Sequence, residues 1–231
     1  MPESQHLQHV YFMPGMAANI TIFENIKLSE DEYVSHYLKW LIPEPKESIK
    51  HYAARLCEHV LHENVVLIGV SFGGIIVQEM AKIISIEKVV IISSVKTRHE
   101  LPNRMKLARK LGLYKLLPTS LVSYVHYVES LPVGSFLKKR AKLYQTYLSI
   151  NDKRYLDWAI KNMVCWDQEV APQDIIHISG DADIVFPIQH LENPIVVEGG
   201  THIMIINKYR WFNKNLPELI RSGKLPEEYI F

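Results

Sequence analysis

Short apolar runs separated by amphipathic stretches recur through the first part of the chain. The run at residues 65–70 is continuous and rich in β-branched side chains, and residues 10–13 and 88–93 form similar runs. Strands that are buried on both faces of a parallel sheet have this pattern, because no face of them needs polar side chains. A fourth strand, with poorer boundaries, is predicted over residues 33–41. These runs predict the first strands of a buried parallel sheet.

Helices are predicted between these strands. Ser48 is placed to cap a helix over residues 49–62, and a second helix is expected to start directly after Ser71 and to end near residue 84. The resulting order of strand, helix, strand, helix and strand predicts an α/β fold with right-handed crossovers and a mostly parallel central sheet flanked by helices.

The pattern changes at residue 97. Up to residue 165 there is almost no strand signal, only amphipathic helical stretches broken by prolines. Strands return at 175–178 and 195–197, and a last helix is predicted over 203–220. We therefore expect a core formed by residues 1–96 and 166–231, interrupted by a helical insertion at 97–165. A connection of this length inside a compact domain usually carries function.

The sequence Gly69-Val70-Ser71-Phe72-Gly73 joins the strongest strand to the following helix and fits the pattern G-x-S-x-G. In a sharp strand-to-helix turn the serine hydroxyl stands clear of the sheet, and glycines are needed because side chains there would strike neighbouring backbone. Ser71 is therefore the candidate nucleophile. The alternative is a plain turn in which the glycines only allow helix and sheet to pack. A nucleotide-binding loop is not indicated, because its glycine and lysine spacings are absent.

A serine nucleophile needs a base and an acid that orients it. His202 lies between the last predicted strand and the last helix, after two glycines, and is the best candidate base; a solvated surface histidine is the alternative. Asp183 follows another strand and is the candidate acid. Asp181 is the runner-up, and either aspartate could instead only shape its own turn. The order Ser71, Asp183, His202 along the chain differs from the trypsin-like and subtilisin-like orders.

Acyl transfer also needs two N–H donors for the oxygen of the tetrahedral intermediate. The Phe72 amide, which follows the nucleophile, is one candidate. The Met16 amide is the other, because Pro14-Gly15 ends the first strand and Gly15 permits an unusual backbone there. Pro14-Gly15 could equally form a simple turn.

Together these residues resemble the α/β-hydrolase superfamily over nearly the whole chain, with small bacterial carboxylesterase-like hydrolases as the nearest look-alikes. The resemblance implies a helical lid at residues 97–165. Gly180, Asp183 and Pro187 match the family's acid loop, which favours Asp183 over Asp181. Only about nine residues precede the first strand, so the family's N-terminal hairpin is expected to be missing and the sheet to have about six strands. The family's usual His-Gly of the oxyanion loop is Pro14-Gly15 here.

Composition narrows the classes of partner. Lysine and arginine total 26 against 25 acidic residues, and this balance gives no drive toward nucleic acid. No apolar run is long enough to span a membrane, and residues 1–6 do not resemble a signal peptide, which predicts a cytoplasmic protein. Cys57 and Cys165 lack metal-site spacing and are expected to be buried free thiols. No cofactor or metal is implied, and the oligomeric state is not predicted.

The predicted reaction is hydrolysis of a small, moderately apolar carboxylic ester through an acyl-serine intermediate. Aromatic residues of the insertion are candidates for the pocket, although they fit an internal lid core as well: Tyr124, Tyr127, Phe136, Tyr144, Tyr147 and Trp158. A thioesterase or a lyase with the same triad is the second hypothesis. For that hypothesis, the basic residues of the lid would receive coenzyme A or a carboxylate. A ligand-binding signalling protein with slow turnover is the third.

Overall fold

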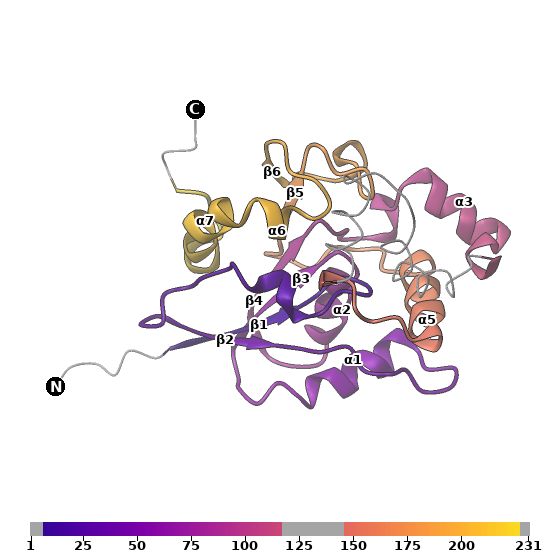
Figure 1. Ribbon diagram of the computed structural model, residues 1–231, viewed down its shortest axis with the longest axis horizontal. Helices are drawn as coiled ribbons and strands as arrows, with labels where there is room; N and C mark the ends of the chain where they lie inside the picture. Colours follow the sequence, from indigo (N-terminus) through magenta and orange to yellow (C-terminus); the bar gives the residue numbers. More distant parts are fainter. Residues whose placement is uncertain (1–6, 117–145, 227–231) are drawn as a thin grey trace, which may run out of the picture.

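The computed structural model describes residues 7–116 and 146–226. Six parallel strands form one sheet in the order β2-β1-β3-β4-β5-β6 (Figure 1). The expected parallel sheet of six strands is thereby confirmed. The strands are β1 (Gln8–Met13), β2 (Tyr33–Tyr37), β3 (Val65–Val70), β4 (Ile86–Ile92), β5 (Ile176–Gly180) and β6 (Ile195–Val197).

Helices cover both faces of the sheet. One face packs against α1 (Ile49–Cys57) and α2 (Phe72–Met80), and α5 (Lys153–Val164) contacts α2 and joins the same core. The opposite face packs against η1 (Ile20–Phe23), α6 (Met204–Asn207) and α7 (Tyr209–Ser222), on the other side of the sheet from α1 and α2 in Figure 1. The remaining helical elements are η2 (Arg98–Glu100), α3 (Asn103–Leu111), η3 (Leu113–Leu116) and η5 (Ile188–His190).

The two layers of core follow from the alternation of side chains along each strand. In β1, Tyr11 and Met13 join the core under α1 and α2, whereas Val10 and Phe12 join the core under α7. Every residue of β3 is buried. This double burial explains why the sequence of β3 is a continuous apolar run and not an alternating one.

The sheet order places a topological switch point between β1 and β3. From β1 the chain continues to β2 on one side, and from β3 it continues to β4 on the other. The carboxyl ends of two such strands flank a crevice, which is the usual ligand site of an open α/β sheet. Met13 pairs with Gly69 at this edge, so the turn after β1 lies next to Ser71.

Several element boundaries differ from the prediction, and α2 ends at Met80, about four residues before its predicted end. The second strand ends at Tyr37, because the chain beyond it turns inward and buries Trp40. The first helix ends at Cys57, five residues early. The final helix is broken at Lys208, whose φ of −112° and ψ of 24° leave helical geometry, so that α6 and α7 are separate helices. No strand is found in the described part of residues 97–165, which contains η2, α3, η3 and α5.

Both cysteines are free thiols, as expected. Cys57 is buried, and burial raises the pKa of its thiol to about 11. Cys165 is only half-buried, so its predicted burial was wrong. Cys165 is the C-cap residue of α5, and a helix end leaves more of its side chain to solvent than the helix interior does.

His177 in β5 links stability to pH. Its ring is 3% exposed, Nε2 lies 3.0 Å from the Ser94 carbonyl oxygen, and Nδ1 has no partner among the described residues. Burial lowers the pKa of His177 to about 4 from the ordinary 6.5. Between these values the unfolded chain binds a proton that the folded chain refuses, so stability falls as the pH falls.

We therefore expect His177 to cost roughly 2.5 kcal/mol of unfolding free energy between pH 7.5 and 4.5. Urea unfolding at both pH values should show this loss in the wild type. His177→Gln keeps a side-chain N–H but does not titrate, and its loss should be smaller by about that amount. An equal loss in both proteins would show that His177 titrates normally in the folded chain.

Candidate active site

Ser71 occupies a tight turn between β3 and α2. Its φ of 53° and ψ of −121° lie in a region that non-glycine residues rarely adopt. A Cβ on Gly69 would lie 2.4 Å from the Gly73 carbonyl oxygen, and a Cβ on Gly73 would lie 2.3 Å from the Pro14 carbonyl oxygen. The two glycines of the motif are thus required by close backbone contacts, as the sequence predicted.

Neighbouring strands fix this turn. The Ser71 amide donates to the Ile92 carbonyl oxygen at 2.9 Å, and the Ser94 hydroxyl donates to the Ser71 carbonyl oxygen at 2.7 Å. Both partners belong to the end of β4 and the residues after it. A strained backbone persists only where its surroundings over-determine it, and these bonds supply that restraint. The role of Ser94 was not visible in the sequence, since nothing marks it apart from its position after a strand.

The structure brings the three predicted polar residues together. His202 Nε2 lies 2.9 Å from Ser71 Oγ, and His202 Nδ1 lies 2.9 Å from Asp183 Oδ2. An ionised carboxylate only accepts hydrogen bonds, so Nδ1 carries the proton in this pair and Nε2 has a free lone pair. That lone pair faces the serine hydroxyl, in the arrangement by which a neutral histidine takes a proton from serine.

Asp183, and not Asp181, is the aspartate next to the histidine. The Asp183 side chain is fully buried, and its second oxygen, Oδ1, accepts from the amides of Val185 at 2.7 Å and Phe186 at 3.0 Å. Asp181 lies on an exposed turn. Three hydrogen bonds thus fix the orientation of the Asp183 carboxylate and direct one oxygen at His202.

Two glycines hold the acid loop and the histidine loop together. A Cβ on Gly180 would lie 2.0 Å from the Gly200 carbonyl oxygen, and the Ala182 amide donates to that same oxygen at 3.0 Å. No side chain fits between the loops. This close approach sets the distance between Asp183 and His202. The sequence offered Gly180 and Gly200 as parts of a pattern, without showing that they touch.

The loop after β1 lies against the serine. A Cβ on Gly15 would lie 3.4 Å from Ser71 Cβ, and the Gly15 carbonyl oxygen accepts from the Trp40 indole at 2.9 Å. Within the described ranges no hydrogen bond is found for the amides of Met16 and Phe72. Phe72 directly follows Ser71, and Met16 lines the same cavity as Ser71. The sequence did not predict that Trp40 holds the loop at Gly15, because no local pattern links these two residues.

A cavity of about 470 Å³ opens at Ser71 and His202. This volume is typical of pockets for small molecules. Most of its described wall is apolar. The lining side chains come from the loop after β1, η1, the end of β3, residues 147–148 and the region around α6. The apolar lining residues are Met16, Ala18, Ile22, Val70, Leu148, Ile203, Ile205 and Ile206.

The predicted lid aromatics have different positions. Tyr147 lines the cavity, and its hydroxyl donates to Glu24 at 2.6 Å. Trp158 is instead part of the core, and its indole donates to the Glu47 carbonyl oxygen. The other four predicted aromatics lie outside the described residues.

Three basic residues between positions 97 and 165 donate hydrogen bonds to backbone carbonyl groups. Arg104 donates to the carbonyl oxygens of Ile184 and Val185 in the acid loop, Lys106 to that of His99, and Arg109 to that of Trp166. Their described contacts are therefore structural. The basic residues at 138–142 lie outside the described residues.

No helix among the described residues is long and apolar enough to cross a membrane. Sequence comparison finds no protein-family model and no curated protein that matches this chain.

Solved structures do match it. A thermophilic esterase from Thermogutta terrifontis has a TM-score of 0.63 at 14% identity, over 93% of this chain and 90% of that one. An esterase from Exiguobacterium antarcticum has a TM-score of 0.59 at 17% identity, over 93% and 92%. A bromoperoxidase from Bacillus anthracis also has a TM-score of 0.59, at 18% identity, over 94% and 93%. The chain therefore has the α/β-hydrolase fold, as its sequence motifs had indicated.

Proposed function

We propose that this protein is a serine hydrolase that cleaves carboxylic esters. The observation that carries the proposal is the continuous hydrogen-bonded chain from Ser71 Oγ through His202 to Asp183 at the mouth of an apolar cavity. Esterases and lipases among the solved structures of this fold support the same reaction class. No other serine, and no threonine or cysteine, lines the described part of the cavity.

In the first half of the reaction, Ser71 Oγ attacks the ester carbonyl carbon while its proton passes to His202 Nε2. Asp183 stabilises the imidazolium that forms, because its carboxylate already accepts the Nδ1 proton. The carbonyl oxygen becomes an oxyanion, for which the amides of Met16 and Phe72 are the proposed donors. The C–O bond to the alcohol then breaks, and the alcohol leaves with the proton from His202.

In the second half, water replaces the alcohol. His202 Nε2 takes a proton from the water, and the remaining hydroxide attacks the acyl-serine carbonyl carbon. Collapse of the second tetrahedral intermediate returns the proton to Ser71 Oγ and releases the carboxylic acid. Atoms balance as ester plus water giving acid plus alcohol.

The cavity wall suggests the type of acyl group. Ile22, Leu148 and Ile206 offer aliphatic surface in the cavity that Ser71 also lines, and the described lining residues include no lysine or arginine. A short to medium aliphatic chain therefore fits better than the charged phosphates of coenzyme A. Tyr147 and Leu148 also line the cavity, which supports the proposal that the insertion at 97–165 acts as a lid.

A series of p-nitrophenyl esters from acetate to octanoate tests this proposal. Each added methylene that the cavity buries contributes about 0.8 kcal/mol, so kcat/KM should rise about fourfold per methylene until the cavity is filled. Leu148→Trp fills part of the cavity and should move the optimum to a shorter chain. A rate equal to the background for every ester would contradict the proposal. Faster cleavage of matched acyl-CoA thioesters would favour a thioesterase, and capture of a ligand without turnover would favour a signalling role.

A further inference from the structure

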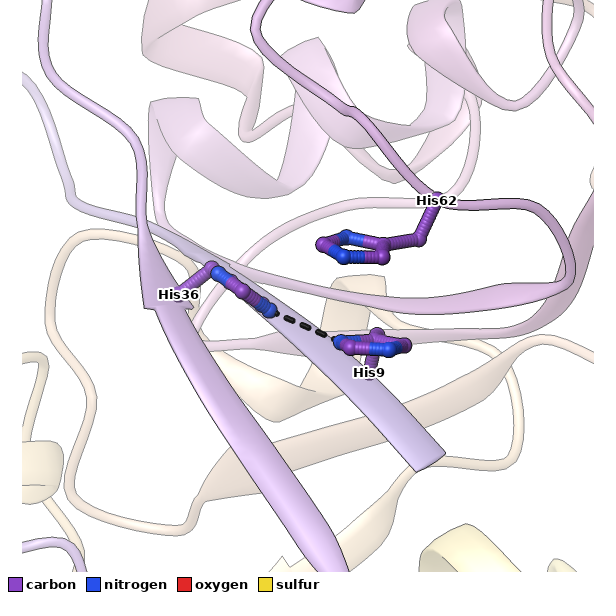
Figure 2. Close-up of side chains that lie close together, drawn as sticks. All are labelled: His9, His36 and His62. Carbon is purple, nitrogen blue, oxygen red and sulfur yellow. Dashed lines mark hydrogen bonds between the residues drawn. The ribbon is translucent and has the colours of Figure 1, made fainter. Parts of the chain in front are cut away.

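Three histidines from separate elements gather at the edge of the sheet opposite Ser71. His9 lies near the start of β1, His36 lies in β2, and His62 lies in the loop between α1 and β3. Figure 2 shows the three rings grouped together, with His62 above His9 and His36 beside them. One ring nitrogen from each histidine lies within 4.8 Å of those of the other two. The cluster brings together imidazoles from two strands and a loop.

The contacts inside the cluster orient the rings. His9 Nδ1 lies 2.9 Å from His36 Nε2, and the rings of His9 and His62 stack with their centroids 3.5 Å apart. The Tyr11 hydroxyl lies 2.7 Å from His62 Nδ1 and also accepts from the Leu61 amide at 3.1 Å. Tyr11 thus engages one nitrogen of His62 and leaves Nε2 as the nitrogen for another ligand.

The donor atoms of the cluster are imidazole nitrogens. No ion pair of His36 or His62 with an acidic side chain is found in the described part of the chain. Imidazole binds a metal ion through an unprotonated ring nitrogen, and a set of three imidazoles suits Zn²⁺ and similar divalent transition metals better than Mg²⁺ or Ca²⁺.

We propose that His9, His36 and His62 form a binding site for Zn²⁺. Tetrahedral coordination at about 2.0–2.1 Å requires ligand nitrogens roughly 3.4 Å apart, with each lone pair directed at the ion. The His62 ring stacks on His9 with an interplanar angle of 11°, so it must turn and approach the other two nitrogens. His62 is free of regular secondary structure and can supply this movement. The facing nitrogens of His9 and His36 are 2.9 Å apart and must separate slightly, and the proton that they share moves to another ring nitrogen when the ion binds. Water completes the coordination.

Two further features fit a metal site. A ligating histidine usually donates its second N–H to an oxygen, and the Tyr11 hydroxyl is placed to accept the Nδ1 proton of His62. His36 and His62 also line a surface cavity of about 810 Å³, through which an ion from solvent can reach the rings. The site therefore has ligands, a supporting residue and an entry path.

A second group of side chains with metal-ligand spacing is Glu44, Glu47 and His51. It is the weaker candidate because Arg55 already binds it. The Arg55 guanidinium lies 2.9 Å from Glu47 and 3.8 Å from Glu44, and it supplies the positive charge that a cation would bring. This group serves as an internal control for the histidine cluster.

The Zn²⁺ site would act on stability and not on ester hydrolysis. Bound metal would cross-link the edge strand β2 to β1 and to the loop that enters β3. Along β1, His9 and the residue next to the catalytic edge, Met13, are about 13 Å apart. The ion is thus remote from Ser71 and does not take part in the proposed reaction. The two proposals can fail independently.

The test is Zn²⁺ titration of the full chain, freed of metal with a chelator and carrying no polyhistidine tag. Calorimetry should show one Zn²⁺ per chain with a micromolar or lower Kd. Each of His9→Asn, His36→Asn and His62→Asn should weaken binding at least tenfold, and Tyr11→Phe about tenfold. His51→Asn should bind as the wild type does. At 100 times Kd, Zn²⁺ should raise the Tm of the wild type by roughly 5–10 °C.

Co²⁺ provides a readout that a folding defect does not produce. The wild type should give the visible absorption bands of tetrahedral Co²⁺, and His62→Asn, a loop substitution, should lose them while keeping its metal-free Tm and its esterase rate. Absence of stoichiometric Zn²⁺ binding would overturn the site. So would wild-type affinity in all three histidine variants, or loss of binding in His51→Asn.

Discussion

Ser71→Ala is expected to lower kcat for ester hydrolysis by about 10⁶-fold, to a rate set by the oxyanion donors and by substrate binding alone. The reason is that His202 then has no hydroxyl to deprotonate at the point where the ester carbonyl binds. In the described chain Ser94 is the next serine to consider, but its hydroxyl donates to the Ser71 carbonyl oxygen and is buried. The measurement is hydrolysis of the best ester of the panel under saturating substrate.

Ser93→Ala is the matched control for this prediction. Ser93 is also a buried serine at a strand end, and its hydroxyl has no partner among the described residues. It should keep an activity within a few fold of the wild type. Both variants should remain folded at the assay temperature, and thermal unfolding of each checks this. A Ser71→Ala enzyme that retains a tenth of the wild-type rate would contradict the proposed nucleophile.

Asp183→Asn is expected to lower kcat by about 10⁴-fold. The amides of Val185 and Phe186 point at Oδ1, so the asparagine must present its carbonyl oxygen to them and its NH₂ group to His202. His202 Nδ1 then has to accept a hydrogen bond, which moves the ring proton to Nε2. In that tautomer Nε2 cannot take the proton of Ser71. The loss should therefore appear in kcat, with little change in the folded structure.

Asp181→Asn is the control for the acid. It removes the same charge two residues away, on an exposed turn that lies outside the hydrogen-bonded chain. Its rate should stay close to that of the wild type. If Asp183→Asn were nearly as active as the wild type and Asp181→Asn were not, the acid would have to be reassigned.

The sheet was the most predictable part of the fold. β3 was placed to the residue, since burial on both faces leaves an apolar run with sharp ends. β2 was placed four residues too long, because Leu38 and Trp40 are apolar for another reason: they fill the core beside the sheet. The break at Lys208 depends on how α6 and α7 pack, which local sequence does not encode. Burial alone therefore does not separate a strand from other core segments.

The candidate site was predictable where a residue's chemistry depends on its position at a strand end. Ser71, Asp183 and His202 each follow a strand, and in a parallel sheet such residues meet at one edge. The supporting contacts were not predictable. The hydrogen bond from the Trp40 indole to the Gly15 carbonyl oxygen joins two residues that no local pattern links. A sequence does not reveal such contacts between distant residues. The histidine cluster is of the same kind, because only pairing of β1 with β2 brings His9 near His36.

Labelling with a fluorophosphonate tests the proposed nucleophile most directly. The reagent reacts with a serine only where a base activates it and an oxyanion site receives its P–O group. We expect one label per chain, found by mass spectrometry on the peptide that contains Ser71, and no label in Ser71→Ala. An unlabelled wild type, or equal labelling of Ser71→Ala, would contradict the account.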